Sequence, residues 1–254
     1  MAYFYLQNKF IKALLIFVTV ISAHGFMRYL SDWENDRPTC THTHQEPWDY
    51  FMLVMQWPQA QCEIANVTGQ HECVIPPVVK GWTIHGLWPS GESKDYPFCC
   101  HLWHFDVNKI QDLLPNLEKY WPNVYADTED DSFWRHEYEK HGTCAASVAG
   151  FEDEHSYFQQ TLTLRSLYTP MTVLEKNGIT PSTDPYKLSD IVNVIDSAYG
   201  VKTCVECGYI KESQTQLLSG LYVCLTKDLQ LKNCTDCEHA CYDDEDVYYH
   251  PLHM

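Results

Sequence analysis

One short stretch of the chain concentrates side chains that can move protons and bind an anion. His136, Glu137, Lys140 and His141 lie within six consecutive residues. On an α-helix, which turns by about 100° per residue, they fall at about 0°, 100°, 40° and 140°, so they share one face. Two imidazoles, a carboxyl group and an ammonium group on a rigid backbone can supply a proton acceptor, a proton donor and a positive charge. The pattern therefore predicts a site that handles an anionic group.

Two other interpretations of this stretch compete with that one. A run of charged residues can be only the solvated face of a helix. A His-Glu pair followed by another histidine is also similar to zinc-binding helices, but that motif needs histidines four residues apart. His136 and His141 are five apart, about 140° around an α-helix that we expect to end at Gly142. This spacing argues against zinc, and we predict no metal.

A third imidazole of interest lies earlier in the chain. The alternation in Trp82–His85 predicts a strand with Thr83 and His85 on one face, and Gly86–Pro89 predicts a turn directly after it. A histidine at the end of a strand is more often structural than catalytic. His85 alone therefore does not indicate a catalytic role, and other features of the chain must support one.

The N-terminus and the cysteines indicate a secreted protein. An apolar run, Ala13–Ile21, follows two lysines, so residues 1–25 are predicted to be a secretory signal peptide, and the run is too short to span a bilayer. Twelve cysteines in such a chain favour disulfides over metal ligands. Sequons at Asn66 and Asn233 predict glycosylation. We expect the extracellular space or the lumen of lysosomes or endosomes, without membrane attachment.

The charge of the chain limits how it could bind nucleic acid. The formal net charge of −17 argues against a broad basic surface that grips nucleic acid, but it allows an enzyme that holds one phosphate locally. Protonation of all 13 histidines would bring the charge from −17 to −4, which favours an acidic working environment.

The remaining patterns predict one α+β domain over residues 49–241. The expected parts, in chain order, are an irregular extension (26–48), a strand (Tyr50–Trp57), a polar loop with Asn66 between Cys62 and Cys73, two short helices divided at Pro115, a helix (Tyr157–Leu167), a helix from Asp184 to Gly200, a strand (Leu221–Leu225) and a solvated acidic tail (242–254).

The two histidine-containing segments together resemble those of the ribonuclease T2 family of secreted and lysosomal acid ribonucleases. One family segment is like Trp82–Pro89 and the other like His136–Cys144, and the resemblance extends from about Tyr50 to Cys241. It implies a single α+β domain with a central, mainly antiparallel sheet that is flanked by helices and stapled by disulfides.

The resemblance also implies a metal-independent endoribonuclease without a cofactor. It would cleave single-stranded RNA through a 2′,3′-cyclic phosphate, with His141 as the general base and His85 as the general acid. Glu137, Lys140 and His136 would stabilise the phosphate. DNA lacks the 2′-hydroxyl nucleophile and would not be cleaved. We expect a monomer.

Base-binding residues also follow from the resemblance. Trp88 and Tyr96 would form one base site, and Gln56 with Phe133 the other, although each could instead be an ordinary core residue. Tyr138 stands where the family usually has tryptophan, and we expect little effect because both are large aromatic residues. Ser90 stands where the family frequently has an acidic residue, which leaves base preference open.

The same resemblance implies four disulfides and leaves two further ones open. The implied pairs are Cys62–Cys73, Cys224–Cys234, either Cys99 or Cys100 with Cys144, and either Cys204 or Cys207 with Cys241. Cys40, Cys237 and the two unused neighbours could form two more bridges. A link from Cys99 or Cys100 to Cys144 would anchor the end of the catalytic helix.

A function of another class remains possible for the same scaffold. A secreted binding, signalling or immunomodulatory glycoprotein could keep the fold while its ribonuclease activity is secondary or lost. The complete set of His85, His136, Glu137, Lys140 and His141 favours the enzyme, because a descendant without activity would not need all five.

Overall fold

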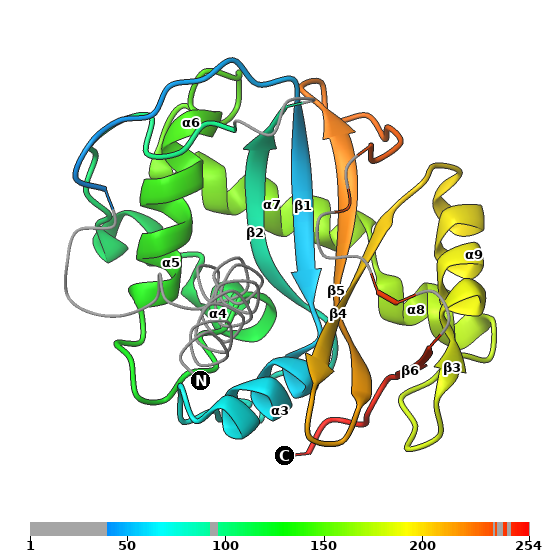
Figure 1. Cartoon of the computed structure of the whole chain (residues 1–254). Helices are drawn as coiled ribbons and strands as arrows, with labels where there is room; N and C mark the ends of the chain where they lie inside the picture. Colours follow the sequence, from blue (N-terminus) through cyan, green and yellow to red (C-terminus); the bar gives the residue numbers. More distant parts are fainter. Residues whose placement is uncertain (1–39, 92–95, 236, 238–240, 243–244, 254) are drawn as a thin grey trace, which may run out of the picture. The chain divides into compact units, whose positions relative to one another are not determined.

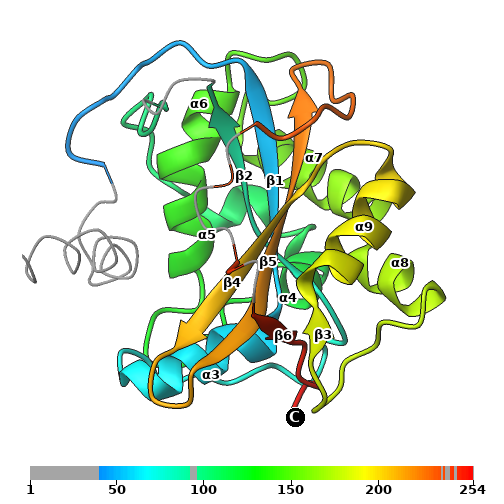
Figure 2. The same ribbon diagram turned by 45° about the vertical axis from the view of Figure 1, so that its right-hand side comes forward.

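The computed structural model describes residues 40–91, 96–235, 237, 241–242 and 245–253. The predicted signal peptide and residues 26–39 of the predicted extension lie outside the described residues. Figures 1 and 2 show a central sheet, with one helical run beside β2 and the long helix α7 behind the strands. The described part of the chain contains no helix that is both long and apolar enough to cross a membrane.

The sheet is antiparallel except for one pair of strands. Its strands are β1 (Tyr50–Gln56), β2 (Thr83–Ser90), β3 (Tyr186–Lys187), β4 (Cys204–Ile210), β5 (Thr215–Thr226) and β6 (Asp246–Tyr248). The spatial order is β2-β1-β5-β6-β3, and β4 also pairs with β5. Among the strands of the described residues, only β5 and β6 run parallel. The α+β class and the mainly antiparallel sheet are therefore confirmed.

Short helices surround this sheet. They are α3 (Pro58–Thr68), the 3₁₀ turn η1 (Val107–Ile110), α4 (Leu114–Tyr120), α5 (Ser132–Glu137), the π-helical turn η2 (Tyr138–Gly142), α6 (Thr143–Ala145), α7 (Glu154–Leu167), α8 (Pro170–Lys176) and α9 (Leu188–Tyr199). α5, η2 and α6 follow one another without a break and form the run beside β2 (Figure 1).

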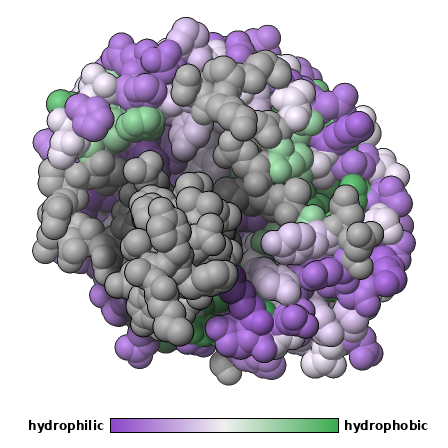
Figure 3. Space-filling model, in the orientation of Figure 1, coloured by the Kyte–Doolittle hydropathy of each residue, from purple (hydrophilic) through white to green (hydrophobic). Residues whose placement is uncertain are grey.

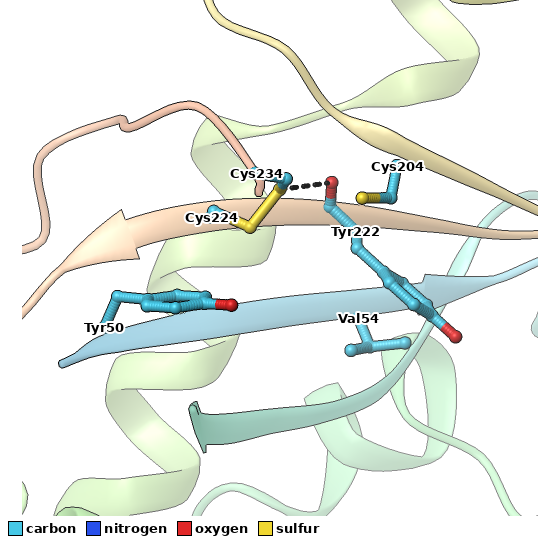
Figure 4. Close-up of a cluster of buried hydrophobic side chains, with 6 residues drawn as sticks. All are labelled: Tyr50, Val54, Cys204, Tyr222, Cys224 and Cys234. Carbon is cyan, nitrogen blue, oxygen red and sulfur yellow. Dashed lines mark hydrogen bonds between the residues drawn. A yellow bond between two sulfur atoms is a disulfide. The ribbon is translucent and has the colours of Figure 1, made fainter. Parts of the chain in front are cut away.

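Alternation along β1 separates the core from the opposite face of the sheet. Phe51, Leu53 and Met55 are fully buried, and the ring of Phe51 lies 5.0 Å from that of Phe151 near the start of α7. On the opposite face, Val54 packs with Tyr222 beside the Cys224–Cys234 disulfide (Figure 4). The described side chains around the rim of the view in Figure 3 are mostly hydrophilic.

Six disulfides cross-link the chain. They are Cys40–Cys99, Cys62–Cys73, Cys100–Cys144, Cys204–Cys237, Cys207–Cys241 and Cys224–Cys234. Cys100 rather than Cys99 is the partner of Cys144, so this bridge ties the end of the run α5–η2–α6 to the preceding loop. The backbone N–H of Cys99 also donates to the carbonyl of Lys140 at 2.7 Å.

Three predictions from the local pattern are wrong. The expected loop after Cys62 is largely helix α3, because Pro58 starts a helix whose buried side includes Ala65 and which Gly69 ends in a left-handed conformation. β2 continues to Ser90 where Gly86–Pro89 was expected to turn.

The third error concerns the last predicted helix. It begins at Leu188 and not near Asp184, because Tyr186–Lys187 pairs with β6.

The tail is solvated only in part: Glu245 and Asp246 are exposed as expected, but the residues after them pack against the domain. Asp246–Tyr248 adds a strand to the sheet, and Val247 and Tyr249 are fully buried. The indole N–H of Trp82 donates to the hydroxyl of Tyr249 at 2.9 Å. The run of acidic residues hid the alternating apolar positions that follow it.

We predict that Tyr249→Ala destabilises the protein by about 3–5 kcal/mol, because it removes a buried aromatic ring and leaves a cavity. Tyr242→Ala is the matched control in the same tail, since Tyr242 is 60% exposed and should cost less than about 1 kcal/mol. Urea unfolding with intact disulfides measures both. Equal losses would show that the tail does not pack as described.

Candidate active site

One extra residue in β2 decides where His85 points. The pairing of β1 with β2 joins Val54 to Gly86 and Met55 to Ile84, so the register passes over His85. In a regular strand, residues 85 and 88 would lie on opposite faces. The bulge brings both to the same side, where the ring of His85 meets Trp88 edge-on at 5.1 Å.

A π-helical turn after α5 also brings two side chains to the same side, those of His136 and His141. The turn spans Tyr138–Gly142, and in a π-helix residues five apart are neighbours. The rings of His136 and His141 therefore lie 6.4 Å apart. The expected stop at Gly142 is wrong, because the helix continues into α6. A Cβ atom at this glycine would stand 2.7 Å from the Tyr138 ring, so the close packing here needs glycine.

Trp88 joins the strand and the helix. Its indole N–H donates to Oε2 of Glu137 at 2.8 Å, and its ring stacks on His141 at 5.1 Å. A Cβ atom at Gly86 would collide with both Oε2 of Glu137 and Nε1 of Trp88. Gly86 therefore leaves the room for the hydrogen bond, and Trp88 touches three predicted catalytic groups.

The carboxyl group of Glu137 lies between the two segments. Its Oε1 atom is 3.6 Å from Nε2 of His85, and the Glu137 side chain is only 1% exposed. The ring of Phe133, one helical turn earlier, lies 5.5 Å from that of His85. Neither Oε1 of Glu137 nor Nδ1 of His141 has a hydrogen-bond partner within the described residues. Two buried polar atoms of this group thus lack a hydrogen-bond partner that a bound polar group could supply.

Burial sets the protonation of this group of side chains. It raises the pKa of Glu137 to about 8, against the opposing effects of the Trp88 hydrogen bond and the charge of Lys140. Burial, followed by the charge of Lys140, lowers the pKa of His85 to about 3. The same two causes hold the pKa values of His136 and His141 well below 6.5. At pH 5 without substrate, His85 and Glu137 are therefore neutral, and burial favours the neutral form of His136 and His141.

The helix could bring three metal-binding side chains together. Ligand atoms of His136, Glu137 and His141 lie within 4.8 Å of one another. The argument from five-residue spacing against zinc is therefore wrong, because it assumed α-helical geometry. The adjacent charge of Lys140, which lowers the pKa of both histidines, would also repel a cation.

The predicted base-binding residues fall into different surroundings. Trp88 and Phe133 contact His85 directly. Gln56 is 5% exposed and pairs with Thr83 on the face of the sheet that carries Trp88. Tyr96 is 44% exposed and follows residues 92–95, which lie outside the described part of the chain. Their roles in binding bases stay predictions.

Several residues around the site were not found from the sequence. Glu139 is buried, and its carboxylate accepts the backbone N–H of Phe105 at 3.1 Å. Trp121 and Trp134 form hydrogen bonds that lead to His85. Only their residue type could have marked these tryptophans, since a buried indole needs an acceptor for its N–H.

The sequence matches the ribonuclease T2 family over residues 48–234. Ribonuclease Oy of Magallana gigas is 41% identical over 214 residues, which cover 81% of this chain and 98% of that protein. Ribonuclease T2 of Homo sapiens is 38% identical over 192 residues, which cover 74% of this chain and 71% of that protein.

Solved structures give the same result. Human RNase T2 aligns with a TM-score of 0.66 at 36% identity and covers 80% of this chain and 99% of its own. RNase NT in complex with 5′-AMP aligns with a TM-score of 0.71 at 28% identity and covers 82% of this chain and 100% of its own. This chain therefore belongs to the ribonuclease T2 family and is an acid endoribonuclease.

Proposed function

We propose that the protein cleaves single-stranded RNA by transphosphorylation and without a metal. In the first step, the 2′-oxygen attacks phosphorus and the bond from phosphorus to the 5′-oxygen breaks. His141 accepts the proton of the 2′-hydroxyl, and His85 donates a proton to the departing 5′-oxygen. The products are a 2′,3′-cyclic phosphate and a free 5′-hydroxyl, and water then opens the cycle to a 3′-phosphate.

One observation carries this assignment. The imidazoles of His85 and His141 come from different segments, yet both rings lie 5.1 Å from the ring of Trp88. Base and acid must flank one phosphate, and this arrangement supplies two imidazoles around a shared indole. A binding protein without activity would not require buried, unsatisfied polar atoms between them.

Three further side chains would act on the charge of the phosphate. Lys140 would offset the negative charge that gathers on the non-bridging oxygens in the transition state. Glu137, neutral below its pKa of about 8, would donate a hydrogen bond from Oε1 while Trp88 holds Oε2. His136 would bind the phosphate before and after the reaction.

Bases would stack on aromatic rings beside this centre. Trp88 and Phe133 would take this role, which their contacts with His85 support, and Gln56 and Tyr96 would complete the two base sites. RNase NT, which has a similar structure, was solved in complex with 5′-AMP. A nucleotide is therefore a suitable probe of the site in this protein.

We further propose that the protein is a secreted or lysosomal glycoprotein that acts as a monomer. Asn66 is exposed near the end of α3 and is open to modification. Asn233 is exposed as well, although its side-chain oxygen accepts the backbone N–H of Lys202 at 2.8 Å.

We predict that the purified protein cleaves RNA in the presence of a chelator and leaves DNA of the same sequence intact. His85→Ala and His141→Ala should each lower kcat about 10³-fold, because each removes one proton-transfer group. Initial rates from pH 4 to 8, with detection of cyclic-phosphate ends, measure this. His155→Ala is the control, since this exposed histidine pairs with Asp112 outside the site. Activity lost in chelator and restored by zinc would contradict the proposal.

We expect Lys140→Ala to lower kcat about 10²-fold and to change KM less than about threefold, because its charge acts mainly on the transition state. Lys176→Ala, at the exposed end of α8, controls for loss of one positive charge. Weaker RNA binding with an unchanged kcat would assign Lys140 to substrate binding instead.

We predict that binding of a DNA dinucleotide takes up protons. The phosphodiester would raise the pKa of His85 from about 3, because an adjacent negative charge favours the imidazolium. Protonation is then favoured in the complex, so affinity should rise about three- to tenfold as the pH falls from 7 to 5. Calorimetry in two buffers of different ionisation enthalpy counts the protons, and His85→Ala should reduce the number. Equal affinity at both pH values would exclude this coupling.

A further inference from the structure

The bulge that orients His85 also leaves its carbonyl group outside the regular ladder between β1 and β2. A buried carbonyl in such a place needs a donor from elsewhere. The indole N–H of Trp121, at the end of α4, donates to this carbonyl at 2.8 Å. Trp121 is fully buried, and the bond to the carbonyl of His85 is partly buried.

A second tryptophan extends the connection to the catalytic helix. The indole N–H of Trp134 donates to the carbonyl of Trp121 at 2.7 Å, and Trp134 is 5% exposed. Trp134 lies in α5, two residues before His136 and three before Glu137. Two indoles in series therefore link the backbone of His85 to the helix that carries the other catalytic groups.

We propose that Trp121 and Trp134 are positioning residues that fix the separation between His85 and the catalytic helix. This inference rests on the proposed function, because it assigns catalysis to groups on both segments. The chain of bonds ends on the backbone of His85 at one side and on α5 at the other. Proton transfer depends steeply on distance, so the separation of these two segments bears directly on the rate.

Packing makes this link rigid. The Trp121 ring lies 5.1 Å from Phe158 and 6.1 Å from Tyr157, both on α7 behind the sheet. The hydroxyl of Tyr157 donates to the carbonyl of Leu87 on β2 at 3.1 Å. Trp121 is thus held against a helix that is itself bonded to the strand of His85, and it cannot move without moving both.

The protein contains a matched control for loss of an indole N–H. Trp57 is 1% exposed, and its N–H donates to the carbonyl of His250 at 2.9 Å. This bond resembles that of Trp121 in burial, acceptor type and length, but it holds the C-terminal tail. Trp57→Phe therefore reports the cost of losing such a bond without disturbing the proposed link.

The test compares Trp121→Phe, Trp134→Phe and Trp57→Phe in the full mature chain. We expect similar losses in melting temperature for all three. Trp121→Phe and Trp134→Phe should lower kcat about tenfold with KM nearly unchanged and by the same factor for substrates of different base. Trp57→Phe should keep kcat within twofold of the wild type. An equal loss of kcat in Trp57→Phe would overturn the proposal.

A double variant tests whether the two indoles act as one unit. Trp121→Phe with Trp134→Phe should lower kcat little more than either single variant, because breaking one bond already breaks the link. Multiplied losses would overturn a shared role. If Trp121→Phe does not fold, benzothienylalanine at position 121 keeps the ring shape and removes only the N–H donor, and an unchanged kcat would then refute the inference.

Failure of this inference is distinct from failure of the proposed function. Activity that survives in His85→Ala and His141→Ala would remove the catalytic assignment itself. Normal kcat in the tryptophan variants, with inactive histidine variants, would remove only the positioning role.

Discussion

The arrangement of the active site depends on which face of the sheet each side chain of β2 occupies. His85 and Trp88 are separated by an odd number of positions, and a regular strand would send them to opposite faces of the sheet. One inserted residue in β2 puts both on the face that meets the catalytic helix. The contact of His85 with Trp88 follows from this insertion. At the same place the carbonyl of His85 accepts a hydrogen bond from Trp121, and Gly86 lies directly against Glu137 and Trp88.

The helical run that carries His136 and His141 also departs from regular geometry, here by a π-helical turn. His136 and His141 would diverge on an α-helix, and the π-helical turn aligns them. Such irregular backbone persists where surrounding contacts determine it. Here the Cys100–Cys144 disulfide and the bond from Cys99 to the carbonyl of Lys140 hold the turn from outside. The site is therefore built from two backbone irregularities, the bulge in β2 and the π-helical turn, which the rest of the domain stabilises.

These irregularities mark what the sequence could and could not predict. β1 and α7 follow from alternation and helical spacing, and residue types alone identified a group able to transfer protons near an anion. Local periodicity could not predict the relative positions of His85, Trp88 and His141, because it does not foresee the bulge and the π-helical turn; only the family resemblance implied that His85 and His141 act in one site. The packed tail was missed for another reason, since its acidic residues precede a short strand whose burial depends on β5, far away in the sequence.

Electrostatics connects this geometry to an acidic working range. A chain with a net charge of −17 repels RNA, and the site offers one lysine beside imidazoles that burial keeps neutral. The missing positive charge must therefore come from protons that bind together with the phosphate, and these are more available at low pH. Burial thus favours the neutral imidazoles in the free protein, and under the proposed mechanism a bound phosphate would favour the charged form of His85, the proposed acid, while His141 acts as the base.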